Sequence, residues 1–139
     1  MKYEQSFCKA VGEWGCYALC IINIAEEVTG LRYNILQKLE EAIDKGYISW
    51  NKNNYYDPAN FDVLNPDLFL AMLTGTRWSV RKESDILYKP KADEYVVERW
   101  ERNGYGHFAR TKAGYNSLQD SKCVTLGKLA SLRIFKKIG

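Results

Sequence analysis

A cysteine near the start of the chain has the setting of a reactive thiol. Cys16 stands in Trp14-Gly15-Cys16-Tyr17, before an apolar segment in which Leu19, Ile22 and Ala25 recur at helical spacing. The free N–H groups and the dipole at a helix start stabilise an anion, so we expect the pKa of this thiol to be lowered. The alternative is a buried structural cysteine, because free cysteine is among the most buried residue types.

A histidine far along the chain is the natural partner for that thiol. His107 is the only histidine, so a thiol activated by imidazole in this chain must use it. It follows the turn sequence 103–106, which predicts a hairpin and places the imidazole at a sheet end, facing a helix start. The alternative is a packed or surface histidine without a chemical role.

Asn116 is the candidate residue to orient the imidazole. We expect residues 115–118 to form a strand antiparallel to the one that carries His107. An Asn or Asp side chain there can accept from the ring and fix its tautomer. Asp120 is the second candidate, and a plain turn asparagine is the alternative interpretation of Asn116.

Gln5 is the candidate donor for an oxyanion. A side-chain amide beside the Cys16 backbone N–H would form an oxyanion hole. The loop between Gln5 and Cys16 must then fold back, and a surface glutamine is the alternative.

Bulk properties restrict the class of protein. A chain of 139 residues with 46% hydrophobic content predicts a single domain over 1–139. A net charge of +3 does not indicate nucleic-acid binding. No apolar stretch of membrane-spanning length and no signal peptide is evident, so we expect a cytoplasmic protein without membrane contact. The four cysteines and one histidine lack metal-ligand spacing, so we expect reduced thiols and no metal or cofactor.

The order of elements predicts the fold class. Hydrophobic periodicity and glycine or proline punctuation predict helices over about 15–29, 32–45 and 66–74, with a short strand at 47–50 and a loop at 51–60. Alternating patterns predict strands over 76–82, 94–101 and 106–111, with further strands at 115–118, 123–125 and 129–135. Helices followed by antiparallel strands indicate an α+β fold, with N-terminal helices packed against the sheet.

These motifs together resemble a known superfamily. The chain is similar, over nearly its whole length, to the papain-like cysteine peptidases, and most similar to the branch with the double-glycine leader peptidases and an uncharacterised phage and bacterial group. The residues that carry the likeness are Gln5, Gly15-Cys16-Tyr17, His107-Phe108, Tyr115-Asn116-Ser117-Leu118, Ser121, Val124, Gly127-Lys128-Leu129 and Arg133-Ile134-Phe135.

The resemblance implies a papain-like fold and a role for each site residue. Cys16 would be the nucleophile, His107 the general base and acid, Asn116 the orienter and Gln5 the oxyanion donor. Peptidases of this branch commonly have Gly after the cysteine and an Asp orienter, whereas this chain has Tyr17 and Asn116, and its Gln5 spacing is longer. An asparagine serves as orienter in papain itself.

Three functions fit this pattern. The first is a thiol hydrolase that cuts a peptide, isopeptide or cell-wall amide bond, with the 51–60 loop and Trp50, Tyr55 and Tyr56 contacting substrate, unless these aromatic residues only pack. The second hypothesis is a catalytically silent, phage-encoded binding module that inhibits a host protein. The third is acyl or amide transfer by the same residues. The expected partner is therefore a peptide or protein.

Overall fold

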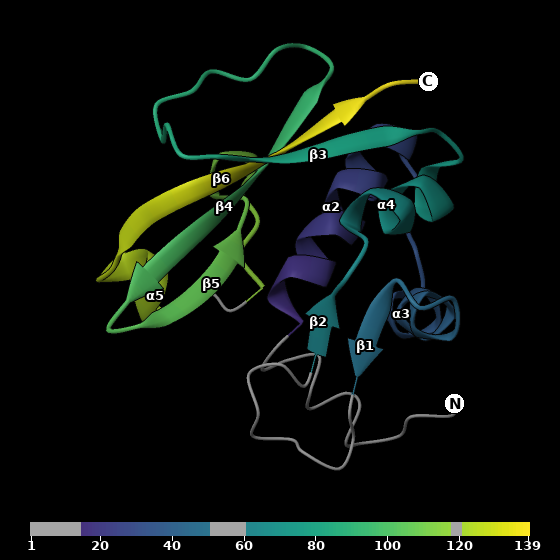
Figure 1. Ribbon diagram of the computed structural model, residues 1–139, viewed down its shortest axis with the longest axis horizontal. Helices are drawn as coiled ribbons and strands as arrows, with labels where there is room; N and C mark the ends of the chain where they lie inside the picture. Colours follow the sequence, from purple (N-terminus) through teal and green to yellow (C-terminus); the bar gives the residue numbers. More distant parts are fainter. Residues whose placement is uncertain (1–14, 51–60, 118–120) are drawn as a thin grey trace.

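The computed structural model describes residues 15–50, 61–117 and 121–139. Helices and a short hairpin form one half of the molecule, a four-stranded sheet forms the other, and helix α2 runs between them (Figure 1). Both sheets are antiparallel, so the fold is α+β, as the element order predicts. No described helix is long and apolar enough to cross a membrane.

Among the described residues, the helical half contains three helices and one hairpin. Helix α2 spans Cys16–Thr29, α3 spans Ile35–Asp44 and α4 spans Pro66–Thr74. Gly30 and Gly75 end α2 and α4 with φ of 72° and 75°, a conformation that costs glycine little. Strands β1, Ile48–Trp50, and β2, Phe61–Val63, pair on either side of the 51–60 segment.

The sheet half has the strand order β3-β6-β4-β5. Strand β3 spans Trp78–Glu83, β4 spans Glu94–Arg102, β5 spans Tyr105–Ala109 and β6 spans Lys128–Lys137. The turn between β4 and β5 has φ of 51° at Asn103 and 82° at Gly104, the pair of positive values that a tight hairpin turn requires. Strand β5 is an edge strand of this sheet, and it contacts α2 at the start of the helix.

The core joins the two halves. Fully buried side chains of α2, among them Ile21 and Ile24, pack with Phe69 and Leu70 of α4 and with Phe135 of β6. The core cluster comprises Ala18, Cys20, Ile21, Ile22, Ile24, Ala25, Leu39, Ala42, Ile48, Phe61, Phe69, Leu70, Leu73, Trp78, Val97 and Phe135. Helix α2 is consequently held against both α4 and the sheet. This packing fixes the position of its first turn along β5.

Several expectations need correction. The second helix begins at Ile35, not near 32, because the Asn34 side chain accepts from Gln37 N at 3.2 Å and caps it there. Residues 123–125 do not form a strand: the short helix α5 spans Lys122–Thr125. Only an isolated bridge between Arg110 and Tyr115 replaces the expected strand over 115–118 within the described residues. Strand β2 was not expected from the sequence.

Candidate active site

The candidate thiol occupies the first turn of α2. Cys16 follows the N-cap Gly15, and the helix begins with the hydrogen bond from Leu19 N to Gly15 O at 2.9 Å. Its Sγ accepts from the backbone N–H of Phe108 on β5 at 3.5 Å, across 92 positions of sequence. That N–H belongs to the peptide bond between His107 and Phe108. The thiol therefore lies beside the backbone of the only histidine.

His107 and Asn116 form the second contact of the site. His107 lies on β5 with 4% of its surface exposed, and its Nε2 is 2.7 Å from Asn116 Oδ1. An amide oxygen only accepts, so Nε2 carries the proton and Nδ1 is the basic nitrogen of the neutral ring. Nδ1, the nitrogen left to accept a proton, is the ring nitrogen nearer the main chain, and the thiol contacts the main chain at the next residue, Phe108.

A turn brings Asn116 back to the histidine. The chain leaves β5, makes a single 3-10 turn at Thr111–Ala113, and returns through two backbone hydrogen bonds between Arg110 and Tyr115, at 2.8 and 2.9 Å. The next residue is Asn116. A bridge of one residue pair is therefore sufficient to orient the amide, although the sequence pattern predicted a longer strand.

Burial opposes ionisation of the thiol. Desolvation raises the pKa of Cys16 above the usual value of a thiol, and this outweighs the lowering by the N–H groups of Phe108, Tyr17 and Cys16 and by the charge of Arg99. The expectation of a lowered pKa is therefore wrong for this state of the protein, because the helix start is packed against the sheet edge. The neutral thiol is the favoured resting form of Cys16.

An aromatic stack fills the space next to the thiol. The ring of Tyr17 stacks on that of Phe108, with centroids 4.3 Å apart and an interplanar angle of 19°. The rings of Tyr17 and Phe135 meet edge to face, with centroids 6.2 Å apart. Burial raises the pKa of the Tyr17 hydroxyl. Tyr17 thus packs α2 onto the sheet next to Cys16.

A buried arginine fastens the helix to the sheet. Arg110, 5% exposed, donates from Nε to Val96 O at 3.0 Å, from one terminal nitrogen to Asn23 Oδ1 at 2.7 Å, and from the other to Glu27 Oε1 at 2.9 Å. It follows β5, whereas Asn23 and Glu27 belong to α2. Sequence reasoning missed this residue, because an arginine after a strand is ordinarily a surface residue. Its position directly after the histidine strand was the available signal.

The other two cysteines that the structure describes, Cys20 and Cys123, have no evident role in the site. Cys20 is fully buried, and burial raises its pKa well above the usual value, as expected for a core residue one turn beyond Cys16. Cys123 is half-buried, with Sγ 3.7 Å from Tyr105 O. Among the described residues no cluster of His, Cys, Asp and Glu side chains is placed to bind a metal ion.

Some candidate residues fall outside the described part of the chain. Gln5, Asp120, Tyr55 and Tyr56 all lie there. Trp50 is described, and it packs half-buried against the core at the end of β1. The interpretation of Trp50 as a packing residue therefore accounts for its position.

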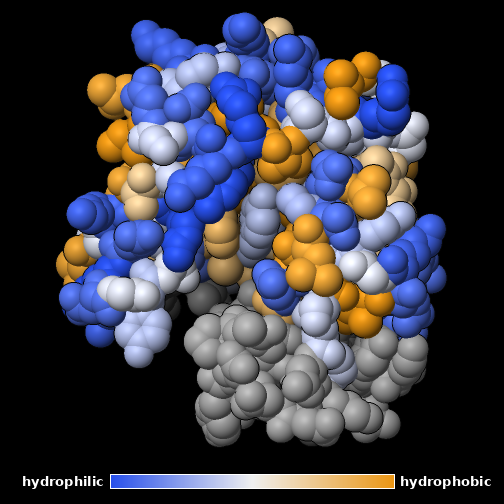
Figure 2. Space-filling view, in the orientation of Figure 1, coloured by the Kyte–Doolittle hydropathy of each residue, from blue (hydrophilic) through white to orange (hydrophobic). Residues whose placement is uncertain are grey.

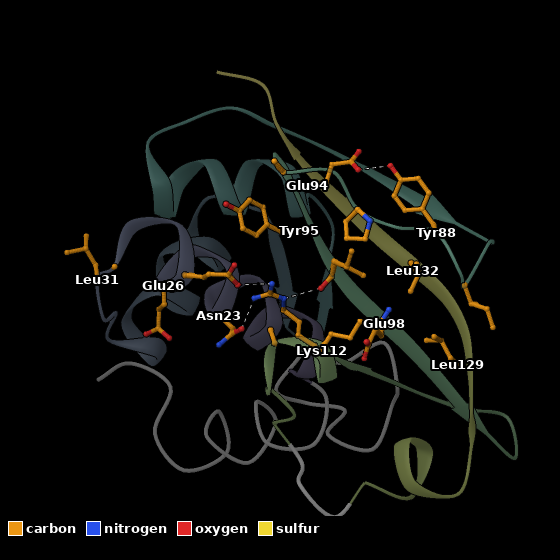
Figure 3. Close-up of a pocket in the computed structure, with 18 of the residues that line it drawn as sticks. Asn23, Glu26, Leu31, Tyr88, Glu94, Tyr95, Glu98, Lys112, Leu129 and Leu132 are labelled. Carbon is orange, nitrogen blue, oxygen red and sulfur yellow. Dashed lines mark hydrogen bonds and ion pairs between the residues drawn. The ribbon is translucent and has the colours of Figure 1, made fainter.

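A cavity within the described residues lies away from the thiol. It measures about 870 Å³ and lies between the C-terminal half of α2, the 84–93 segment and the sheet (Figure 3). Glu26, Tyr88, Glu94 and Leu132 are among its lining residues, whereas Cys16 and His107 are not. Tyr88 and Arg81 hold the Glu94 carboxylate, with hydrogen bonds of 2.5 and 3.3 Å. The cavity is thus no part of the thiol site.

Comparison with known proteins gives one match. The model of a family described as "Protein of unknown function, DUF261" matches residues 1–137 of the chain. No curated protein and no solved structure matches it.

Proposed function

This chain belongs to the DUF261 family, and we propose that it is a papain-like thiol hydrolase, a cysteine peptidase or amidase that acts on a peptide or amide bond. The observation that supports this most is the convergence of Cys16, His107 and Asn116 from three separate segments. One contact joins Cys16 Sγ to the His107–Phe108 peptide, and the other joins His107 Nε2 to Asn116 Oδ1. An activated nucleophile needs this set: thiol, base and orienting group.

The reaction follows from the protonation states. In the resting site the thiol holds its proton, because burial raises the pKa of Cys16. As the sulfur attacks the carbonyl carbon, its proton moves to His107 Nδ1, and the Asn116 oxygen holds the ring by its Nε2–H. His107 then gives the proton to the leaving amine. Water, deprotonated by the same nitrogen, releases the acyl group from sulfur.

The oxyanion of the tetrahedral intermediate needs donors. The Cys16 backbone N–H has no intrahelical acceptor at the first turn of α2, so it can donate to the substrate oxygen. The resemblance to papain-like peptidases assigns the second donor to Gln5. We propose a peptide or protein substrate and a cytoplasmic site of action. Acyl transfer differs only in the group that accepts the acyl chain.

One observation favours a second candidate, a catalytically silent papain-like module that inhibits a host protein. Burial raises the pKa of Cys16, so the thiol is not an anion by itself, as expected for a protein that keeps the fold but does not catalyse a reaction. In the hydrolase, by contrast, His107 must take the proton of the thiol before it reacts near neutral pH. The two candidates therefore differ in a measurable property, the dependence of thiol reactivity on the imidazole.

Alkylation of the full-length protein separates these candidates. Iodoacetamide at about pH 6, followed by peptide mapping, reports the reactivity of each cysteine, because a thiol of ordinary pKa is only about 0.1–1% ionised there. For the hydrolase we expect labelling of Cys16 well before Cys123, and its loss in His107→Ala with native circular dichroism. Slow labelling of Cys16, no faster than that of Cys123 and unchanged in His107→Ala, would leave the silent module. Cys16→Ser is the mapping control, and Cys123 is the internal reference for reagent quality.

A further inference from the structure

A group of cations lies on one face of the sheet, close to the thiol. The register pairs Lys82 with Arg133 and Arg99 with Ser131, and strand side chains alternate between faces, so Lys82, Arg99 and Arg133 share one face. Lys82, Arg99 and Lys128 line a hollow of about 530 Å³ in which Glu101 is the only carboxylate. We call Lys82, Arg99, Lys128 and Arg133 the basic face. Figure 2 shows hydrophilic side chains gathered over the sheet half.

Two arginines of the basic face meet on the aromatic ring next to the site. The guanidinium carbons of Arg99 and Arg133 lie 5.7 and 5.6 Å from the centroid of Phe108. Tyr17 covers one side of that ring at 4.3 Å, so both guanidinium groups must use the remaining side or edge. Stacking on one ring thus holds two like charges close together. Like charges repel, and an anion between them would relieve this repulsion.

The charges of this pair are incompletely neutralised. Arg99 is 3.3 Å from Glu101, a half-exposed carboxylate. Within the described residues Arg133 has no ion pair, and its hydrogen bonds go to Ser131 Oγ at 2.9 Å and Leu132 O at 3.2 Å, both from one terminal nitrogen. A guanidinium carries five N–H donors, so donors of Arg133 remain for a ligand. A carboxylate is the group that such a fork binds best.

The arginine pair adjoins the reacting atom. Phe108 holds both guanidinium groups on its ring and donates its backbone N–H to Cys16 Sγ. The positive charge of Arg99 also reaches the sulfur, where it lowers the pKa of Cys16 against the larger effect of burial. A ligand whose carboxylate met the pair would therefore lie within a few residues of a carbonyl at the thiol.

We propose that the basic face binds acidic side chains of the substrate, with Arg99 and Arg133 receiving a carboxylate within a few residues of the scissile bond. This inference rests on the proposed function and narrows its substrate class to acidic polypeptide segments. A polypeptide fits better than a nucleic acid, because the net charge is only +3 and the cations form a patch of four residues, not an extended stripe.

Two alkylating reagents of matched size test the proposal. Iodoacetate carries a carboxylate and iodoacetamide is its neutral counterpart, so the ratio of their rates at Cys16, divided by that ratio for a small free thiol, reports anion attraction alone. We expect a corrected ratio above one in the full chain. Arg99→Gln and Arg133→Gln should each lower it by up to about fivefold, and about 1 M NaCl should lower it too.

A matched control comes from the same strand. Lys137 lies on the same face of β6 as Arg133, four residues on and roughly 13 Å away, beyond the screening length of about 8 Å at physiological salt. Lys137→Gln removes the same charge and should leave the ratio unchanged. A corrected ratio of one, or an equal fall in Lys137→Gln, would overturn the proposal.

Failure of the proposed function would be visible separately. At about pH 9 a thiol alkylates without help from an imidazole, so the reagent ratio measured there tests the basic face even if His107→Ala has no effect at about pH 6. A second measurement identifies the ligand class. An alternating Glu-Ala peptide should protect Cys16 from iodoacetamide where the Gln-Ala peptide does not. Protection by a single-stranded oligonucleotide but not by the Glu-Ala peptide would exclude the acidic polypeptide.

Discussion

Arg110 offers a sharp test of how the site is assembled. Replacing Arg110 with Met keeps a long apolar stem and removes the three donors that bond Val96, Asn23 and Glu27. Arg110 is 5% exposed, whereas the half-buried Val96 and Asn23 line the cavity with it, so water can replace only part of the hydrogen bonding that they lose. The change therefore detaches the middle of α2 from the end of the histidine strand.

The magnitude follows from the individual bonds. Each hydrogen bond from the charged guanidinium to a neutral acceptor contributes about 1.5–3 kcal/mol. The Glu27 side chain is 49% exposed, so its ion pair adds less than about 1 kcal/mol. Removing a buried cation recovers part of its desolvation cost. We expect Arg110→Met to lower the free energy of unfolding by about 2–4 kcal/mol.

Denaturant melts measure this loss, and Glu27→Gln is the control. Glu27→Gln should cost less than about 1 kcal/mol, and Arg110→Met should lower the melting temperature by roughly 6–12 °C. At a temperature where the variant is folded by circular dichroism, we also expect slower iodoacetamide labelling of Cys16. A loss under about 1 kcal/mol for Arg110→Met, or an equal loss in Glu27→Gln, would refute the conclusion that Arg110 holds α2 against the sheet.

Three more changes probe the site and its support. Asn116→Ala should slow the alkylation of Cys16 at about pH 6 by roughly tenfold, because the imidazole loses its acceptor; an unchanged rate would contradict this. Burial raises the pKa of the Cys20 thiol, so its stabilising effect is complete below about pH 8.5 and is lost as pH rises toward the folded pKa. Cys20→Ala should flatten the alkaline fall of unfolding free energy by about 1.4 kcal/mol per pH unit, and an equal slope in both proteins would be the opposing result. Gly127→Ala should cost about 2–3 kcal/mol in denaturant melts, since its Cβ would lie 2.2 and 2.4 Å from backbone oxygens. Gly106→Ala, whose Cβ meets only the movable Arg99 side chain, should cost less.

Local signals predicted much of the fold. Glycines mark the ends of α2 and α4, and Asn103-Gly104 marks the tight turn, because these positions require positive φ. Alternation of side chains located β3, β4 and β6 to within a few residues. The weak points were short elements: the segment 123–125 is helical, and β2 was overlooked, because three or four residues carry too little periodicity to identify a partner.

The buried faces of helices were only partly predictable. In α4, Leu68 is 44% exposed, whereas Leu70, two residues on, is fully buried. In a helix this apolar throughout, periodicity does not select a face, and the docking of α4 on α2 and β3 selects it instead.

The sequence by itself determined which residues can do the chemistry: a thiol at a helix start, a single histidine after a hairpin turn, and an amide nine positions later. The tertiary structure decided what surrounds them. Contacts across long stretches of sequence place the His107–Phe108 peptide at the sulfur and Arg110 against α2. The same packing removes water from Cys16 and so raises its pKa, against the expectation from the helix start. Desolvation depends on what packs around a group, and no local sequence pattern encodes it.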